Sequence, residues 1–325
     1  MNWTASIDIK PLPMPITHRQ EIFLIGSCFT EHIGRELQEL KFQTCMNPHG
    51  ILFETESVCR SLISYIEQDF YKESDLFYHH ELWQSWDHHG RFSDPDPVKC
   101  LKQINHSQRE AHESLKNSDW LIITLGSSFT YRLQENRRWV ANCHKYPGSA
   151  FEKVLVPIED QIARLDNLIH RLFHFNNRIK ILFTISPVRH LRDGVVENNR
   201  SKARLIEAVH HLVQKFERLF YFPAYELVVD VLRDYRFYDI DLAHPNYAAT
   251  QYVMERFSEF AFDEPTKELN KELKQLVMAQ KHRPQHWGSS QHRLFMAKQL
   301  ELALKLSQTH PYLNLDDAIK YFKNN

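Results

Sequence analysis

The sequence lacks an excess of charge of either sign. Its 325 residues include 40 Lys and Arg against 41 Asp and Glu, which gives a net charge of −1. A protein that binds along a phosphate backbone depends on an excess of basic side chains. We therefore expect no nucleic-acid partner.

Long apolar runs are also missing. No run approaches the roughly 18 residues that a membrane span requires. The first residues, MNWTASIDIKPLPMPITHR, contain no basic segment followed by an apolar one, which is the pattern of a secretory signal. The sequence thus predicts a cytoplasmic protein that does not associate with a membrane.

Cysteines are few, and their spacing does not suggest disulfide pairs. The chain has five, at positions 28, 45, 59, 100 and 143, and a disulfide framework is not expected from them. Histidine pairs occur at positions 79 and 80 and at positions 88 and 89, but no CxxC or HExxH spacing accompanies them. We expect no metal site and no cofactor.

Short apolar runs recur through the first two thirds of the chain, at residues 21–26, 119–126 and 179–186. The segments between them have apolar residues at helical spacing. This alternation is typical of a parallel sheet with helices on both faces. Helices are predicted at 30–41, 56–67, 97–117, 159–176, 198–216 and 246–260. The runs end in GSCFT, GSSFT and SPVRH, so the ligand crevice is expected at those strand ends.

Two regions depart from this alternation. Residues 70–97 are rich in aromatic residues and histidine without clear periodicity, and they are predicted to form a long functional loop. From residue 264 the sequence becomes amphipathic and rich in lysine. We therefore divide the chain into an α/β domain at 1–263 and a helical C-terminal extension at 264–325. The extension is suited to cover the crevice, to mediate dimerisation or to recruit a partner.

A nucleophile and its partners are suggested by two short stretches. Ser27 lies where the first strand turns into a helix, where a hydroxyl is held rigidly near free backbone N–H groups. The alternative is that Ser27 only caps the helix. Asp241 and His244 are three residues apart, a spacing that suits an orienting carboxylate and a general base. Alone, the same pair is also compatible with a turn former and a surface residue.

Longer segments resemble a known family. They are GSCFT (26–30), NPHGILF (47–53), LWQSWDHHGRFS (82–93), ITLGSSF (123–129), VANCHKYPGSAF (140–151), ISPVRHLRDG (185–194) and YFPAYELVVDVLRDYRFYDIDLAHPN (221–246). Together they resemble the GSCFA-domain family, a bacterial branch of the SGNH (GDSL-like) hydrolases. The resemblance covers roughly residues 7–260. It implies a flavodoxin-like three-layer α/β/α sandwich with a mostly parallel sheet.

The resemblance also implies roles for residues. Ser27 becomes the nucleophile, His244 its base and Asp241 the residue that orients the imidazole. Gly50 matches the superfamily's oxyanion-hole glycine. The superfamily's third donor, an asparagine, is replaced in this sequence by Ser128. Either Ser128 donates, or Asn142 reaches in from the following segment, or the hole is weaker.

Several other residues compete for roles near the site. Cys28 is a rival nucleophile because a helix N-terminus lowers a thiol pKa, but we expect it to pack beneath the turn. His88 and His89 are expected to line the pocket. Arg189 and His190 follow a strand end, where a guanidinium can hold a carboxylate or phosphate. The alternative for Arg189 is an ion pair with a neighbouring acid such as Asp193.

The resulting expectation is a serine hydrolase that cleaves an acyl ester through an acyl-enzyme. O-acetyl groups on carbohydrate are included by analogy, so the expected partner is a small-molecule or carbohydrate ester. An O-acyltransferase with the same triad is one alternative. A carbohydrate- or metabolite-binding protein without catalysis is another, and a metal-dependent hydrolase is a third. The oligomeric state stays open.

Overall fold

A five-stranded parallel sheet forms the centre of the molecule in a computed structural model that describes residues 5–283, 286 and 288–324. The strand order is β2-β1-β5-β9-β10, with every neighbouring pair parallel. The strands are β1 (Glu21–Gly26), β2 (Gln43–Met46), β5 (Trp120–Leu125), β9 (Lys180–Ile185) and β10 (Leu219–Phe222). Because all five run the same way, their carboxyl ends lie along one edge of the sheet.

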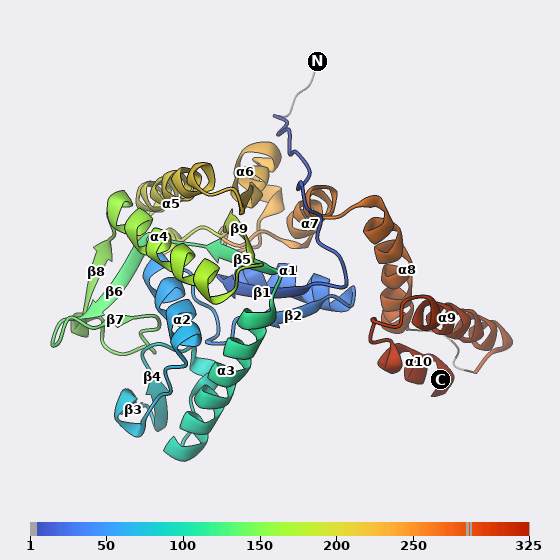
Figure 1. The fold of residues 1–325 in the computed structure, drawn as a ribbon, viewed down its shortest axis with the longest axis horizontal. Coiled ribbons are helices and arrows are strands. Elements are labelled where there is room, and N and C mark those ends of the chain that lie inside the picture. Colours follow the sequence, from blue (N-terminus) through green and yellow to red (C-terminus); the bar gives the residue numbers. More distant parts are fainter. Residues whose placement is uncertain (1–4, 284–285, 287, 325) are drawn as a thin grey trace.

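Helices cover both faces of this sheet (Figure 1). One face packs against α1 (Cys28–Glu39) and α7 (Tyr247–Ala261). The other packs against α2 (Thr55–Glu67), α3 (Pro97–Asn117), α4 (Ile158–Phe175) and α5 (Val195–Lys215). Alternate residues of each strand enter the two cores, as in β1, where Leu24 faces α1 and Phe23 faces the other layer. The predicted three-layer α/β/α architecture is confirmed.

Most predicted elements lie close to the observed ones. The three predicted strands correspond to β1, β5 and β9, and the predicted helices to α1, α2, α3, α4, α5 and α7, with bounds that differ by at most three residues. The edge strands β2 and β10 were not predicted. Each has only four residues, and an edge strand has one neighbour and less need for a continuous apolar run.

The insertion at 70–97 is not a loop without secondary structure. It contains the antiparallel pair β3 (Leu76–His79) and β4 (Leu82–Ser85) and one-turn helices at Glu73–Asp75 and Gly90–Phe92. Trp86 stacks on Phe77 with ring centroids 3.6 Å apart, which anchors the hairpin. A second antiparallel sheet, in the order β7-β6-β8, consists of β6 (Phe129–Leu133), β7 (Trp139–Val140) and β8 (Phe151–Leu155).

The C-terminal part is helical, as expected, with α8 (Glu264–Lys281), α9 (Ser290–Thr309) and α10 (Asp316–Asn324). Its apolar side chains, including Leu273 and Leu306, join the core under α1 and α7. Lys281 of α8 also pairs with Glu39 of α1 at 2.6 Å. The boundary at residue 263 stays a prediction. None of the helices in the described ranges combines the length and the apolar composition needed to cross a membrane.

The segment between β10 and α7 carries the late candidate residues. It consists of the short helix α6 (Ala224–Glu226), a π-helical turn at Leu227–Leu232, a one-turn helix at Tyr235–Phe237 and a loop that leads into α7. A bridge between Tyr238 and Pro245 closes that loop. Further one-turn helices lie at Gly148–Ala150 and Leu191–Asp193.

Candidate active site

Ser27 lies between the end of β1 and the start of α1. Its backbone N–H donates to the carbonyl of Thr124 at 3.1 Å, and its carbonyl accepts from Thr30 at 2.9 Å. The Ser27 Oγ accepts a hydrogen bond from the N–H of Phe29 at 3.3 Å and so caps the helix. Only 3% of Ser27 is exposed. The predicted position on a rigid strand-to-helix turn is confirmed, and the capping role is present as well.

Gly26 allows this turn to lie against the neighbouring strand. Its φ is +146°, and a Cβ atom there would lie 2.2 Å from the carbonyl oxygen of Thr124 on β5. The Gly26 N–H donates to the Asn47 Oδ1 at 2.8 Å, and its carbonyl accepts from Leu52 at 3.0 Å. The backbone that presents Ser27 is thus fixed from two sides.

Asp241 and His244 form one hydrogen-bonded unit on the loop before α7. The Nδ1 of His244 lies 2.5 Å from the Oδ2 of Asp241. The other carboxylate oxygen of Asp241 accepts from the N–H groups of Ala243 at 2.9 Å and His244 at 3.0 Å. These backbone hydrogen bonds, and the bond to the imidazole, lower the pKa of Asp241 to about 2. The carboxylate therefore stays ionised at neutral pH and orients the ring.

This loop lies between the end of β9 and helix α1. The carbonyl of Ala243 accepts from the N–H of Arg189 at 3.0 Å, just after β9. On α1, burial lowers the pKa of His32, and the nearby charges of Arg35 and His244 add smaller effects in the same direction. His32 of α1 and Tyr247, three residues after His244, also line the same hollow, so the loop lies near the helix that begins directly after Ser27.

Contact between the nucleophile and the base is not made in this state. Among the described residues there is no hydrogen bond between the Ser27 Oγ and His244, and about half of the His244 side chain is exposed, 48%. Catalytic hydrogen bonds are often long before substrate binds and tighten in the complex. The structure thus brings the three triad candidates to one edge of the sheet without closing the triad.

Two predicted oxyanion donors are already used within the fold. The N–H of Gly50 donates to the carbonyl of Asn47 at 2.7 Å in a tight turn. The hydroxyl of Ser128 is buried and donates to the carbonyl of Ser201 on α5 at 2.7 Å. Neither is a free donor in this structure, so these two assignments are not supported. The Oδ1 of Asn142 accepts from the N–H of His144 at 2.9 Å, and Asn142 lines the neighbouring cavity.

The prediction that Cys28 is packed beneath the turn was wrong. Cys28 is partly exposed, whereas Ser27 is the more deeply buried of the two. The reason is that Ser27 turns its hydroxyl toward the helix backbone as a cap, while Cys28 is the first helical residue. Burial still raises the pKa of the Cys28 thiol, and the Phe29 N–H and the charge of Lys202 only partly oppose this effect.

A cavity of about 890 Å³ opens at the same edge of the sheet, although Ser27, Asp241 and His244 are not among its lining residues. His89, Arg189 and His190 line it, as predicted for these three, and Lys153 and Ser127 contribute further polar side chains. Burial lowers the pKa of His190 to about 4. We call this space the crevice cavity.

Two details of the predicted lining differ from the structure. His88 is only 1% exposed, makes a tilted ring contact with His49 and a T-shaped one with Tyr71, and does not line the crevice cavity. Asp193 pairs with Lys153 rather than with Arg189. The Arg189 guanidinium instead lies 4.9 Å from the centre of the Tyr238 ring.

Lys202 was missed by the sequence reasoning. It is 1% exposed, and its Nζ donates to the carbonyl of Ser186 at 2.7 Å, just beyond the end of β9. Its charge acts on both Cys28 and His190, which places the ammonium near the floor of the site. The signal was its spacing on α5, because it lies three residues before Leu205 and seven before Val209 on the buried face.

Replacing Lys202 with methionine is expected to stabilise the protein at pH 7. Burial lowers the pKa of Lys202 from 10.5 to about 7. Between these values the unfolded state binds the proton and the folded state does not, so the burial penalty grows as the pH falls from 10.5, is nearly complete at pH 7 and keeps its full size below that pH. The free energy of unfolding should rise on the order of 3 kcal/mol at pH 7, less what is lost with the hydrogen bond to Ser186.

Urea unfolding of wild type and Lys202→Met at pH 7 and pH 10 measures this effect. The exposed Lys305 on α9 provides a matched control, Lys305→Met, that should change little at either pH. A Lys202→Met protein that is equally destabilised at both pH values would contradict the assigned burial penalty.

The described ranges also bear on the metal-dependent alternative. No group of three or more His, Cys, Asp or Glu side chains there is arranged to hold a metal ion. The histidines at 88 and 49 that lie together in the fold are paired with Ser85, Ser61 and Gln108.

Comparisons with known proteins give a family and distant structural likenesses, of which one is described below. A model of the GSCFA family matches residues 21–257, and a model of the C-terminal domain of GSCFA domain proteins matches residues 273–325. No curated protein matched the sequence. An acetyl xylan esterase, Est2A, from the rumen bacterium Butyrivibrio proteoclasticus matches with a TM-score of 0.39 and 8% sequence identity. That match covers 76% of this chain and 64% of the esterase chain.

Proposed function

The chain belongs to the GSCFA family, and we propose that it is an SGNH-type hydrolase of acyl esters that acts through Ser27, His244 and Asp241. The observation that carries the proposal is the 2.5 Å hydrogen bond between His244 and Asp241 on a loop beside the start of α1. An ionised carboxylate that fixes an imidazole next to a strand-end serine has the parts of a serine hydrolase.

The proposed reaction has two steps. The Ser27 oxygen attacks the ester carbonyl carbon while its proton passes to the Nε2 of His244. The tetrahedral intermediate then expels the alcohol, which takes that proton, and an acyl-enzyme remains. Water next loses a proton to His244 and attacks the acyl carbon. The second tetrahedral intermediate then releases the acid, and His244 returns the proton to the Ser27 oxygen, which regenerates the hydroxyl.

Asp241 acts through His244. Because its Oδ2 holds the Nδ1 proton, the Nε2 of the ring is left as the proton acceptor. The negative charge of Asp241 also stabilises the imidazolium that forms during each step. We propose that Asn142, which lines the crevice cavity, supplies a side-chain donor to the oxyanion.

The proposed substrates are small acyl esters, including O-acetyl groups on carbohydrate. The crevice cavity offers both cationic and neutral polar groups, with Arg189, His89 and His190 on its wall. Burial keeps His190 neutral at physiological pH, since its pKa is about 4. A neutral imidazole can accept or donate a hydrogen bond to an uncharged ester or sugar hydroxyl.

A cysteine hydrolase is the second candidate, favoured by the exposure of Cys28. It would use the same His244 and Asp241 with the Cys28 sulfur as nucleophile. The raised thiol pKa of Cys28 opposes it, because the thiolate is the reactive form. Acyl transfer to a second hydroxyl by the Ser27 mechanism is a further variant, in which an added alcohol such as glycerol should speed acyl release.

Hydrolysis of p-nitrophenyl acetate by the purified full chain tests the proposal. We expect saturable release of p-nitrophenol well above the buffer rate. A folded protein with no turnover on this ester or on acetylated xylan oligosaccharides would contradict it. Repeating the assay with glycerol distinguishes transfer from hydrolysis by the product that forms.

Replacing Asp241 with asparagine is expected to lower kcat roughly 10²-fold with little change in KM. The amide removes the charge and no longer fixes the useful tautomer of His244. Solvent partly compensates because 47% of the Asp241 side chain is exposed. Asp239→Asn, two residues earlier on the same loop, serves as the control. Equal rates for wild type and Asp241→Asn would contradict the orienting role.

A further inference from the structure

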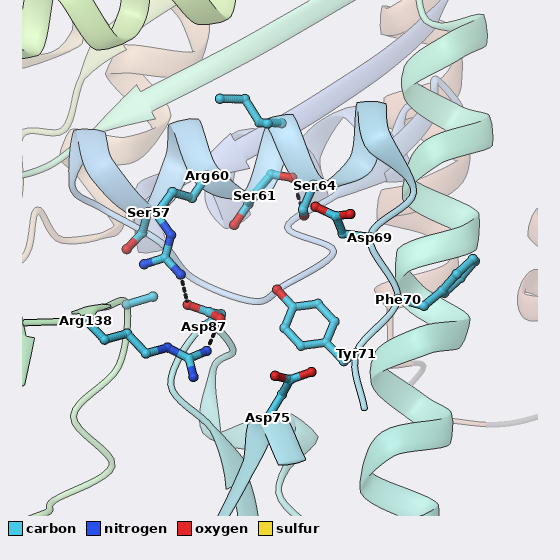
Figure 2. Close-up of a pocket in the computed structure, with 12 residues that line it drawn as sticks. Ser57, Arg60, Ser61, Ser64, Asp69, Phe70, Tyr71, Asp75, Asp87 and Arg138 are labelled. Carbon is cyan, nitrogen blue, oxygen red and sulfur yellow. Dashed lines mark hydrogen bonds and ion pairs between the residues drawn. The ribbon is translucent and has the colours of Figure 1, made fainter. Parts of the chain in front are cut away.

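A second cavity, of about 360 Å³, lies between α2 and the insertion (Figure 2). Its roof is the face of α2 that carries Ser57, Arg60 and Ser61, and its other walls come from residues 69–75, Asp87 and Arg138. The volume is within the range of roughly 300–1,000 Å³ for small-molecule sites. We call it the Arg60 cavity. Neither the triad nor the oxyanion candidates line it.

An ion-pair chain fixes one side of the Arg60 cavity. Asp87 accepts from Arg60 at 2.5 Å with one carboxylate oxygen and from Arg138 at 2.7 Å with the other. Arg60 also donates to the carbonyl of Trp139 at 2.8 Å. A guanidinium has five N–H donors, so both arginines keep donors beyond the bonds that hold them in place.

Acidic groups balance these cations. Asp69 and Asp75 line the cavity on the side away from the arginines, as Figure 2 shows. With Asp87, three aspartates face two arginines, so the lining carries one net negative charge. This balance disfavours phosphate or another strong anion, whose binding would add like charge.

Hydroxyl groups complete the lining. Tyr71 directs its hydroxyl into the cavity, toward Ser61 and Asp87 (Figure 2). Burial raises the pKa of Tyr71, and the charge of Asp87 raises it further, so the phenol remains a neutral donor. Its ring is held by a T-shaped contact with His88 at 4.7 Å. A fixed aromatic ring, hydroxyls, carboxylates and guanidinium donors suit a ligand with many hydroxyl groups of its own.

The Arg60 cavity adjoins the crevice cavity. Ala141 lines both spaces. Asp87 lines the first and His89, two residues later, lines the second, with the buried His88 between them. One short segment therefore forms the wall that the two cavities share.

From this lining and position we propose that the Arg60 cavity binds a neutral sugar unit. Arginine and serine donors meet the sugar oxygens, and Asp69 and Asp75 accept from the sugar hydroxyls. This proposal rests on the function proposed above, because the sugar unit belongs to the same carbohydrate that presents its acyl ester at the crevice cavity. The site then selects oligosaccharide esters over simple acetate esters.

Binding of unacylated disaccharides to the full chain tests this site without any turnover. Xylobiose, cellobiose and maltose are titrated by calorimetry and saturation-transfer NMR, with inorganic phosphate as the anionic probe. We expect at least one disaccharide to bind. Tyr71→Phe removes one hydroxyl and should weaken that binding about 3- to 10-fold, and Arg138→Gln should do so as well. Tyr78→Phe, at a tyrosine 58% exposed on β3 outside the cavity, is the matched control.

Each outcome decides the proposal. Disaccharide binding that is weakened by Tyr71→Phe and unchanged by Tyr78→Phe supports it. Three results overturn it: no disaccharide binding to the folded wild type, binding of phosphate alone, or a disaccharide affinity in both Tyr71→Phe and Arg138→Gln that equals that of the wild type. Ester turnover without sugar binding removes this site and leaves the hydrolase, whereas sugar binding without turnover removes the hydrolase and leaves this site.

Discussion

Replacing Ser27 with alanine is expected to lower kcat for ester hydrolysis on the order of 10⁴-fold or more. The change removes the oxygen that forms the acyl-enzyme, and no bound water can replace a covalent step. It also removes the helix cap to Phe29, which should cost about 1 kcal/mol of stability. Kinetics with p-nitrophenyl acetate and a thermal melt of the same sample separate the two effects.

Cys28→Ala is the matched control, one residue further along the same turn. Its kcat should stay within about 10-fold of wild type, because the thiol has no step in the proposed reaction. The opposite result, in which Cys28→Ala is inactive and Ser27→Ala is not, would assign the nucleophile to the partly exposed thiol.

Gly26→Ala is expected to be the most damaging substitution for folding. Its Cβ would lie 2.2 Å from the Thr124 carbonyl oxygen and 2.8 Å from the Thr124 nitrogen, both backbone atoms of β5. Neither atom can move without separating β1 from β5 at the centre of the sheet. The backbone at φ +146° is also strained for any residue with a side chain. Together these effects should cost about 3 kcal/mol or more.

Chemical unfolding of Gly26→Ala measures that cost. Gly90→Ala is the control. Apart from its neighbours in the chain, no heavy atom would lie within 4 Å of a Cβ on Gly90, and the backbone there does not have a positive φ. A Gly26→Ala protein as stable as Gly90→Ala would show that β1 and β5 are not held as closely as the structure has them.

The sequence was most informative where structure depends on local pattern. Runs such as EIFLIG are buried on both faces, so they remain apolar along their whole length and predict β1 accurately. The edge strand β2, QTCM, is partly exposed at most positions and carries no such pattern. The sequence did not predict the hairpin of β3 and β4, because its side chains pack around Trp86 and α3 and not on the central sheet.

In the candidate site, too, the sequence predicts the features that depend on neighbouring residues. Asp241 and His244 are three residues apart, so their hydrogen bond is a local property that the sequence predicts. Whether Gly50 can act as an oxyanion donor depends on the conformation of its turn. In that turn the N–H of Gly50 donates to the carbonyl of Asn47. The burial of Lys202 follows from its spacing on α5, whereas its hydrogen bond to Ser186 and the Arg60 cavity depend on contacts between elements distant in sequence, which no single segment reveals.

Labelling with a fluorophosphonate probe, followed by peptide mapping, tests the proposed nucleophile most directly. The peptide that contains Ser27 also contains Cys28, so fragmentation must assign the modified residue. The proposed triad predicts a label on Ser27 of the wild type that is lost in Ser27→Ala and strongly reduced in His244→Ala. A folded wild type that takes no label, or a label carried by Cys28, would contradict a serine hydrolase activated by His244 and Asp241.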